Sequence, residues 1–238
     1  MKRRFLLVLS AAVMGGACFA QSPLDELRSK ITGRSTLSDS KITAGLKEAL
    51  SVSTGKAVAS TGRPDGFLKN AAIKILLPPK LQTAGRTMRM VGMGAQVDGL
   101  EVGMNRAAEQ AAPQAKQIFL RALTRMTFND ARGILSGDDT AATQYFKRQS
   151  SQELTTAFTP IVHQAMENVG VVKQYNQLMQ NPMASRFSSG RDLNLDNYVV
   201  GKTLDGLFFV LGQEEKKIRK DPAAQTTSLL KEVFGRTR

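Results

Sequence analysis

The sequence is poor in the side chains that most metal sites and hydrolytic triads require. It contains one histidine, His163, one cysteine, Cys18, and no tryptophan. A structural zinc site takes four ligands, mostly from Cys and His, so this composition excludes the usual ones. A Ser–His–Asp triad needs a positioned imidazole. His163 is predicted on a solvated helix face, about 200° from the apolar stripe that contains Ile161. We therefore expect no metal, no cofactor and no catalytic role for His163.

Aromatic residues are also scarce, at 6% of the chain, and most fall on predicted core stripes. Proteins that bind single-stranded nucleic acid stack bases on aromatic side chains beside positive charge, so this composition does not favour nucleic acid as a partner. Positive charge itself is abundant, with a formal net charge of +13. A basic protein is attracted to acidic surfaces. The expected partners are lipopolysaccharide, anionic lipid, cell-wall polymer or another envelope protein. The alternative, that the charge only maintains solubility, stays open.

The first 20 residues have the pattern of a secretory signal peptide. A basic start, Lys2 to Arg4, precedes an apolar run from Phe5 to Val13 that is too short to span a bilayer. Small residues follow, and cleavage after Ala20 would export the protein to the periplasm. The alternative is a lipoprotein acylated at Cys18, which Gly15 at the third position before the cysteine disfavours. No other apolar stretch is long enough to cross a membrane.

Removal of residues 1–20 would leave a mature chain with no cysteine and a formal charge of +10, because the leader holds three of the charges. Without a disulfide, stability must come from the core. We expect a mobile arm over residues 21–36 and one helical domain over residues 37–238.

Hydrophobic periodicity predicts an all-α fold of about eight helices. The expected helices span residues 37–60, 81–91, 96–126 with a break at Pro113, 127–137, 138–149, 150 onward with a kink at Pro160, 175–180, 195–220 and 221 onward. Residues 63–80 are expected to be irregular, and the apolar run over 72–77, which ends at two prolines, is expected to be either a brief extended segment or a buried loop. Capping boxes are expected at Thr127/Asp130 and at Ser150/Glu153.

Several strings in the chain carry a resemblance. They are GLKEAL (45–50), DGF (65–67), MNRAAE (104–109), AATQYF (141–146), YNQL (175–178), LDGLFF (204–209), EEKKIRKDP (214–222) and LLKEVFG (229–235). In order and coverage they resemble the exported bacterial domain-of-unknown-function family 4197. The resemblance implies a helical exported protein and supplies no catalytic residue.

The polar residues of these strings are the candidate site. We expect Arg106, Glu109, Tyr145 and Asp205 to meet in one partly buried cluster. Arg106 and Glu109 are three residues apart and can share a helix face. Tyr145 and Asp205 lie beside apolar residues, where an unpaired polar group is costly. The cluster is either a structural ion pair that sets helix register or a ligand site.

Two classes of function remain after these exclusions. The first is a non-enzymatic envelope protein that binds or scaffolds through a basic helical surface. The alternative is an envelope hydrolase with a carboxylate pair drawn from Glu109, Asp130 and Asp205, since glycan hydrolysis suits an exported protein. A cleft with two convergent carboxylates would distinguish the hydrolase.

Overall fold

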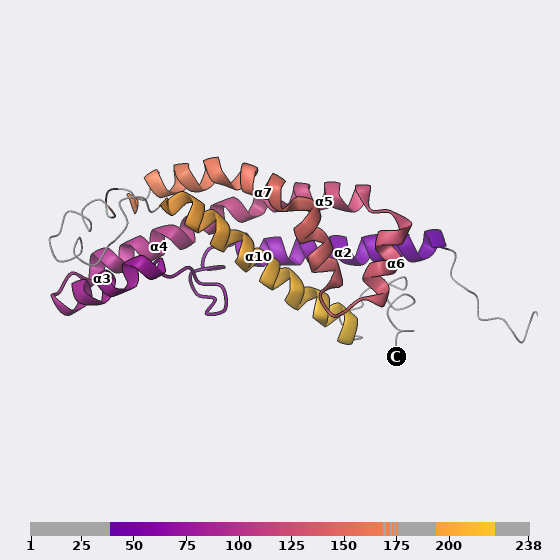
Figure 1. Cartoon of the computed structure of the whole chain (residues 1–238), viewed down its shortest axis with the longest axis horizontal. Coiled ribbons are helices and arrows are strands. Elements are labelled where there is room, and N and C mark those ends of the chain that lie inside the picture. The colour runs from indigo at the N-terminus through magenta and orange to yellow at the C-terminus, as the bar shows by residue number, and fades with distance from the viewer. Residues whose placement is uncertain (1–38, 169, 172, 174, 176–193, 222–238) are drawn as a thin grey trace, which may run out of the picture. The chain divides into compact units, whose positions relative to one another are not determined.

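Helices packed side by side form the part of the chain that the structure describes, which is residues 39–168, 170–171, 173, 175 and 194–221 of a computed structural model (Figure 1). They are α2 (Asp39–Gly62), α3 (Pro79–Met90), α4 (Gly94–Ala111), α5 (Ala115–Arg125), α6 (Phe128–Ser136), α7 (Ala141–Asn168) and α10 (Leu195–Lys220). A 3-10 turn, η1 (Ala112–Gln114), separates α4 from α5. These residues contain no strand, which confirms the all-α prediction, and their seven α-helices and one 3-10 turn differ slightly from the eight expected.

Several predictions lie outside the described residues. The expected signal peptide and arm fall in residues 1–36, and the expected helices after Tyr175 and after Asp221 fall in residues 176–193 and 222–238.

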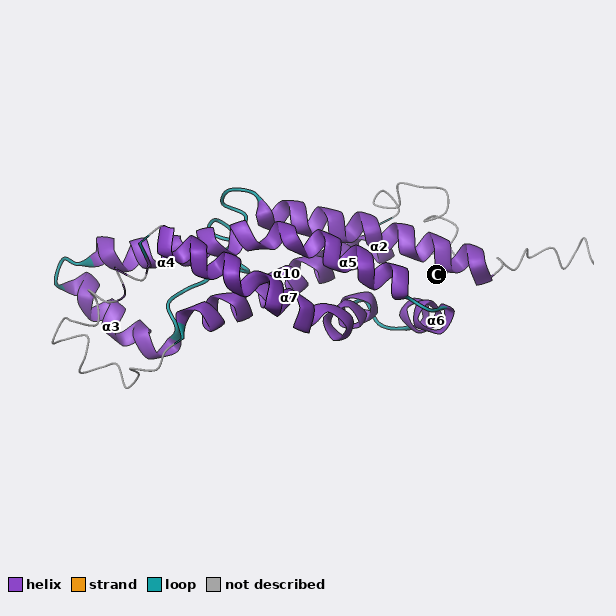
Figure 2. Cartoon of the chain, turned by 90° about the horizontal axis from the view of Figure 1, so that it is seen from above, coloured by secondary structure: helices purple, strands orange, loops and turns teal. Residues whose placement is uncertain are grey.

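Three long helices, α2, α7 and α10, form the centre of the packing. α10 packs against both α7 and α2, and α4 and α5 pack against α7 (Figures 1 and 2). α2 buries Leu46 and Leu50 together with small residues such as Ala49 and Ala57. Its buried hydroxyls are satisfied within the helix; Thr54, for example, donates to the Leu50 carbonyl oxygen at 2.8 Å. Small side chains and self-satisfied hydroxyls let the neighbouring helices approach α2 closely.

Proline sets the break between α4 and α5. Pro113 has no N–H and cannot continue an α-helix ladder, so the chain makes the turn η1 there, as predicted. The proline ring packs on the end of α2, where a Cβ added to Gly62 would lie 2.9 Å from the Pro113 Cγ. The break therefore also joins α2 to the turn.

Helix α7 corrects one prediction from the sequence. We expected one helix to end near Gln149 and another to begin at a Ser150/Glu153 capping box. Instead α7 runs through both positions as one helix of 28 residues with Pro160 inside it. Ser150 is fully buried, and its hydroxyl donates to the Phe146 carbonyl oxygen one turn earlier, so it cannot serve as a cap.

Phenylalanine rings join α5, α7 and α10 at the centre of the core. The Phe119 ring lies 5.1 Å from that of Phe146, edge to face, and 6.0 Å from that of Phe208. Phe119 and Phe146 are fully buried and Phe208 is 6% exposed. Edge-to-face pairs are favoured over stacked ones because the positive edge of one ring meets the negative face of the other. The predicted stripe through Phe119 and Leu123 is buried along its whole length.

We predict that Phe119→Ala lowers the free energy of unfolding by about 3–5 kcal/mol, because it removes a fully buried ring and leaves a cavity between three helices. Urea denaturation followed by circular dichroism measures the change. Phe209→Ala is the matched control, since Phe209 lies next to Phe208 but is 46% exposed, and it should change stability little. Equal losses for the two variants would contradict the helix phases described above.

Candidate functional site

The irregular segment after α2 begins with a tight turn at Asp65, Gly66 and Phe67. Asp65 has a φ of +65°, the left-handed region that Asp tolerates better than most residues. The backbone of Gly66 packs so close to the end of α2 that a Cβ added to Gly66 would lie 2.4 Å from the Ser60 carbonyl oxygen. The turn directs the fully buried Phe67 ring against α10, where a Cβ on Gly206 would lie 2.6 Å from the ring. The DGF and LDGLFF strings therefore meet in space.

Helix α4 holds this turn through a buried glutamate. Glu109 is 4% exposed, and its Oε1 accepts hydrogen bonds from the backbone N–H groups of Phe67 at 3.0 Å and Leu68 at 3.1 Å. Its Oε2 accepts from the Arg106 guanidinium at 2.6 Å, and the same guanidinium donates to Asp65 Oδ1 at 2.7 Å. We call Asp65, Arg106, Glu109 and the two bonded N–H groups the Glu109 cluster.

Arg106 lies between the two carboxylates of the Glu109 cluster, and Lys69 adds a second positive charge at 2.7 Å from Asp65. Hydrogen bonds to Glu109 and Asp65 raise the pKa of Arg106 above its ordinary value. Hydrogen bonds from Lys69 and from Arg106 lower the pKa of Asp65. The charged forms of Asp65 and Arg106 are thus favoured, and the hydrogen bonds of the cluster attach the turn to α4.

A second side chain of α4 holds the next part of the segment. Asn105 is fully buried, and its Oδ1 accepts from the Ile75 N–H at 2.9 Å while its Nδ2 donates to the Ile75 carbonyl oxygen at 2.7 Å. These bonds fix the extended run, in which Ile73, Ile75 and Leu77 are buried while Lys74 and Leu76 are exposed. Alternation of this kind is expected of an extended chain with one face on a core. Residues 71–73 lie in a turn, and residues 74–78 form neither helix nor strand, so the expected irregular segment is present and its extended part is shorter than residues 72–77.

Of the four residues expected to form one cluster, the structure joins Arg106 and Glu109. Tyr145 is buried elsewhere, where its hydroxyl donates to the Ala122 carbonyl oxygen at 3.0 Å, and burial raises its pKa. Asp205 was expected to be half-buried, but its side chain is 64% exposed and lies 3.4 Å from Lys202. The expectation for Asp205 is wrong because it lies on the face of α10 opposite the buried Leu207 and Leu211.

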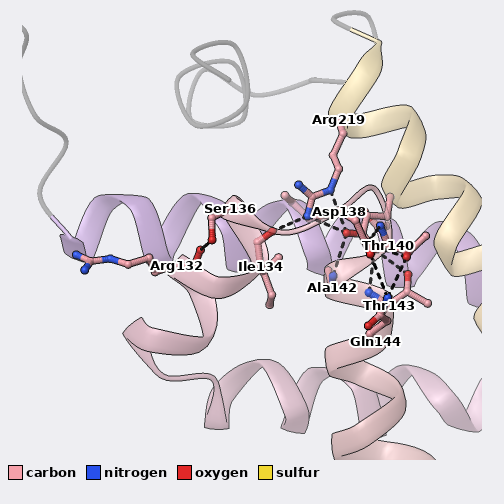
Figure 3. Close-up of polar contacts among 12 residues, drawn as sticks. Arg132, Ile134, Ser136, Asp138, Thr140, Ala142, Thr143, Gln144 and Arg219 are labelled. Carbon is pink, nitrogen blue, oxygen red and sulfur yellow. Dashed lines mark hydrogen bonds and ion pairs between the residues drawn. The ribbon is translucent and has the colours of Figure 1, made fainter. Parts of the chain in front are cut away.

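A second buried glutamate, which is not among the predicted site residues, bonds the first turn of α7, and Figure 3 labels its partners Ala142, Thr143 and Arg219. Glu215 of α10 is 3% exposed, and it accepts from the N–H groups of Ala142 at 2.9 Å and Thr143 at 2.8 Å and from the Thr143 hydroxyl at 2.8 Å. Arg219 donates to Glu215 at 2.9 Å and to the Ile134 carbonyl oxygen at 2.8 Å. We call these residues the Glu215 cluster, and it brings the AATQYF and EEKKIRKDP strings together.

The Glu215 cluster supplies hydrogen-bond acceptors for backbone N–H groups in the first turn of α7. The first N–H groups of a helix have no partner within it, and negative charge there also suits the helix dipole. Asp138, in the turn before α7, accepts from the Thr140 N–H at 2.7 Å, and this bond lowers the pKa of Asp138. The sequence signal that was overlooked is the Glu215/Arg219 pair, four residues apart on the same face as the predicted stripe residues Leu211 and Ile218.

The remaining acids proposed for a hydrolase also have structural partners. Asp130 forms the predicted capping box with Thr127, whose N–H donates to it at 2.9 Å, and the bonds from the Thr127 hydroxyl and N–H lower its pKa. Glu109, Asp130 and Asp205 thus lie in three separate settings. Among the residues that the structure describes, no group of three or more His, Cys, Asp or Glu side chains is placed to hold a metal ion.

His163 has a partner that the sequence did not predict. It is exposed, as expected, but its Nδ1 donates to Asp196 Oδ2 at 2.8 Å, and Glu167 lies 3.4 Å from its other ring nitrogen. The hydrogen bond with Asp196 raises the pKa of His163 above its ordinary value. This contact joins the exposed face of α7 to the first turn of α10.

An open hollow of about 640 Å³ lies between the extended run, the start of α3 and one face of α10. Leu76 lines it from the extended run, and Tyr198, Lys202 and Phe209 line it from α10. The Tyr198 hydroxyl donates to the Leu76 carbonyl oxygen at 3.0 Å, which ties the two walls together. We call this hollow the Leu76 groove. Asp205 is the one acidic residue among the described residues of its lining.

No helix in the described part of the chain combines the length and apolar character that a bilayer crossing requires.

Comparison with known proteins identifies one matching family. A family model described as "Protein of unknown function (DUF4197)" matches residues 36–235. No curated protein matches the sequence, and no solved structure matches the fold.

We predict that Glu215→Gln lowers the free energy of unfolding by about 3–5 kcal/mol, because it removes the negative charge that pairs with the buried Arg219 and turns an amide N–H₂ toward backbone donors. Chemical denaturation measures the change. The control is Glu214→Gln, since the neighbouring Glu214 pairs with Lys217, which is 62% exposed, and should cost about 0–1 kcal/mol. A smaller loss for Glu215→Gln than for its neighbour would contradict the capping role.

We also predict that the stability contributed by His163 depends on pH. Its folded pKa is raised above the unfolded value of 6.5, so the contribution is complete below that pH and is lost as the pH rises through the folded pKa. The wild type should therefore exceed His163→Ala in stability at about pH 5.5 and match it at about pH 9. Because the chain has one histidine, a single NMR titration reports the pKa directly. A value below 6.5 would contradict the ion pair with Asp196.

Proposed function

The chain belongs to the DUF4197 family of proteins of unknown function, and we propose that it is a non-enzymatic binding protein of the cell envelope. It is exported by the leader at residues 1–20, and its basic surface binds acidic envelope components. Anionic lipid, lipopolysaccharide and cell-wall polymer share the negative charge that this surface attracts. Another envelope protein with an acidic face is a partner of the same kind.

The main support for this proposal is that the two buried carboxylates bond to the protein's own main chain and arginines. Each of Glu109 and Glu215 accepts two backbone N–H groups and an arginine, and each builds the fold rather than facing a cleft. A general acid or base must exchange a proton with a substrate within hydrogen-bond reach. Carboxylates whose oxygens are occupied by main-chain donors inside the protein do not have that access.

The geometry gives no comparable support to a hydrolase. A glycosidase needs two carboxylates that face each other across the scissile bond. Within the described part of the chain, Asp205 is the one acid that lines the Leu76 groove, while Glu109 and Asp130 are held in the Glu109 cluster and in the Thr127 capping box. The groove therefore supplies a surface for binding, with lysines at its rim, rather than a pair of catalytic acids.

The export part of the proposal rests on the sequence pattern of residues 1–20. Its alternative, retention on a membrane through an acylated Cys18, also leaves the helical domain in the envelope. The binding role is therefore the same for either form of the N-terminus.

We predict that the purified protein associates with phosphatidylglycerol vesicles at an ionic strength of about 0.05 M and dissociates at about 0.5 M, because screening shortens the reach of its surface charge. Co-sedimentation measures the bound fraction. Phosphatidylcholine vesicles are the control and should bind little protein at either salt concentration. Equal association with both lipids, or association that salt does not weaken, would contradict binding through positive charge.

A further inference from the structure

Two large, exposed apolar side chains, one from the extended run and one from α10, line the Leu76 groove. Leu76 is 51% exposed and Phe209 is 46% exposed, and both line the same hollow. Single exposed apolar residues are common on soluble proteins, whereas apolar residues gathered in one concave site mark a ligand surface. The hollow of about 640 Å³ lies within the size range of sites for one small ligand.

The position of Leu76 is imposed by the fold. Asn105 bonds both backbone groups of Ile75, so the alternation of the extended run places Leu76 outward. The Tyr198 hydroxyl then holds the Leu76 carbonyl oxygen at 3.0 Å. A site whose walls are fixed before binding loses little conformational entropy when a ligand enters.

Positive charge lines the groove beside these apolar side chains. Among the lining residues that the structure describes, Lys74 and Lys202 are opposed by one acid, Asp205, which gives these residues a formal charge of +1. Lys74 makes no ion pair within the described residues, and the Lys202–Asp205 pair is loose, at 3.4 Å. A neighbouring hollow of about 390 Å³ shares Leu76 and is lined by two arginines and one glutamate. The whole region therefore complements an anion with an apolar body.

We propose that the Leu76 groove binds one long-chain fatty acid. The aliphatic chain lies against Leu76 and Phe209, and the carboxylate lies between Lys74 and Lys202. One negative charge matches the formal charge of the groove, and one chain matches its size. The inference rests on the proposed function in one respect, because the envelope location would supply the fatty acid from its lipids.

The test measures binding of oleate to the purified full chain by isothermal titration calorimetry, below the concentration at which oleate forms micelles. We expect saturable binding of one oleate per chain. Leu76→Ser and Phe209→Ser should each weaken the affinity about tenfold, since each removes an apolar contact at the centre of the site. Both side chains are partly exposed, and circular dichroism checks that the variants fold. Absence of saturable binding to the wild type would overturn the proposal.

Two controls separate the apolar and the charged parts. Met90→Ser changes a side chain that is 79% exposed and outside the groove, so it should leave oleate affinity unchanged. Lys74→Glu should weaken oleate binding by about fivefold and leave the neutral oleyl alcohol unaffected. An equal loss in Met90→Ser would overturn the site, and equal binding of oleate and oleyl alcohol would overturn the carboxylate contact.

Other occupants of the groove give different results. If a second copy of the chain covers it, sedimentation of the wild type shows a dimer that Phe209→Ser dissociates and oleate does not, which overturns the proposal. Salt-sensitive association with anionic vesicles, without oleate binding, refutes the fatty-acid site and leaves the proposed function intact. Oleate binding without vesicle association refutes the proposed function alone.

Discussion

A buried carboxylate that accepts main-chain N–H groups is the interaction on which this structure depends. It occurs twice, at Glu109 and at Glu215, and in each case an arginine on the same helix neutralises the charge. Burying a carboxylate is costly unless hydrogen bonds and a counter-charge replace its water. When hydrogen bonds and a counter-charge do replace the water, the carboxylate fixes the position of one segment against another. Apolar contacts alone are not directional and would fix that position less well.

The two buried carboxylates have different consequences. The Glu215 cluster satisfies the N–H groups of Ala142 and Thr143 in the first turn of α7, so the start of this helix is tied to α10. The Glu109 cluster, together with Asn105, fixes a segment that has no helix or strand to satisfy its backbone. That segment forms one wall of the Leu76 groove. The groove therefore has its shape because α4 holds an irregular chain in one conformation.

The strings that carry the family resemblance acquire a physical meaning from these contacts. DGF and MNRAAE meet in the Glu109 cluster, and AATQYF and EEKKIRKDP meet in the Glu215 cluster. The polar residues of these strings hold helices and turns together, which is the structural role considered for them in the sequence analysis. Of the residues that face a ligand in our proposal, Lys74, Leu76 and Lys202 lie between the strings, whereas Phe209 is the last residue of LDGLFF.

The sequence by itself determined the helices whose signals are local. Pro113 ends α4, the Thr127/Asp130 box begins α6, and the apolar stripe of α10 gives its full length, because proline geometry, capping and helical periodicity act over a few residues. The Ser150/Glu153 box shows the limit of such signals, since burial within α7 overrode it.

Only the tertiary structure decided the partners of the polar residues and the existence of the groove. Glu215 and Ala142 are 73 residues apart in the chain, and Glu109 and Phe67 are 42 apart. No local pattern specifies such a pair, because the contact depends on how several helices pack at once. The exposure of Asp205 and Leu76 was decided in the same way, by which face of α10 meets the core and by the hold of Asn105 on Ile75.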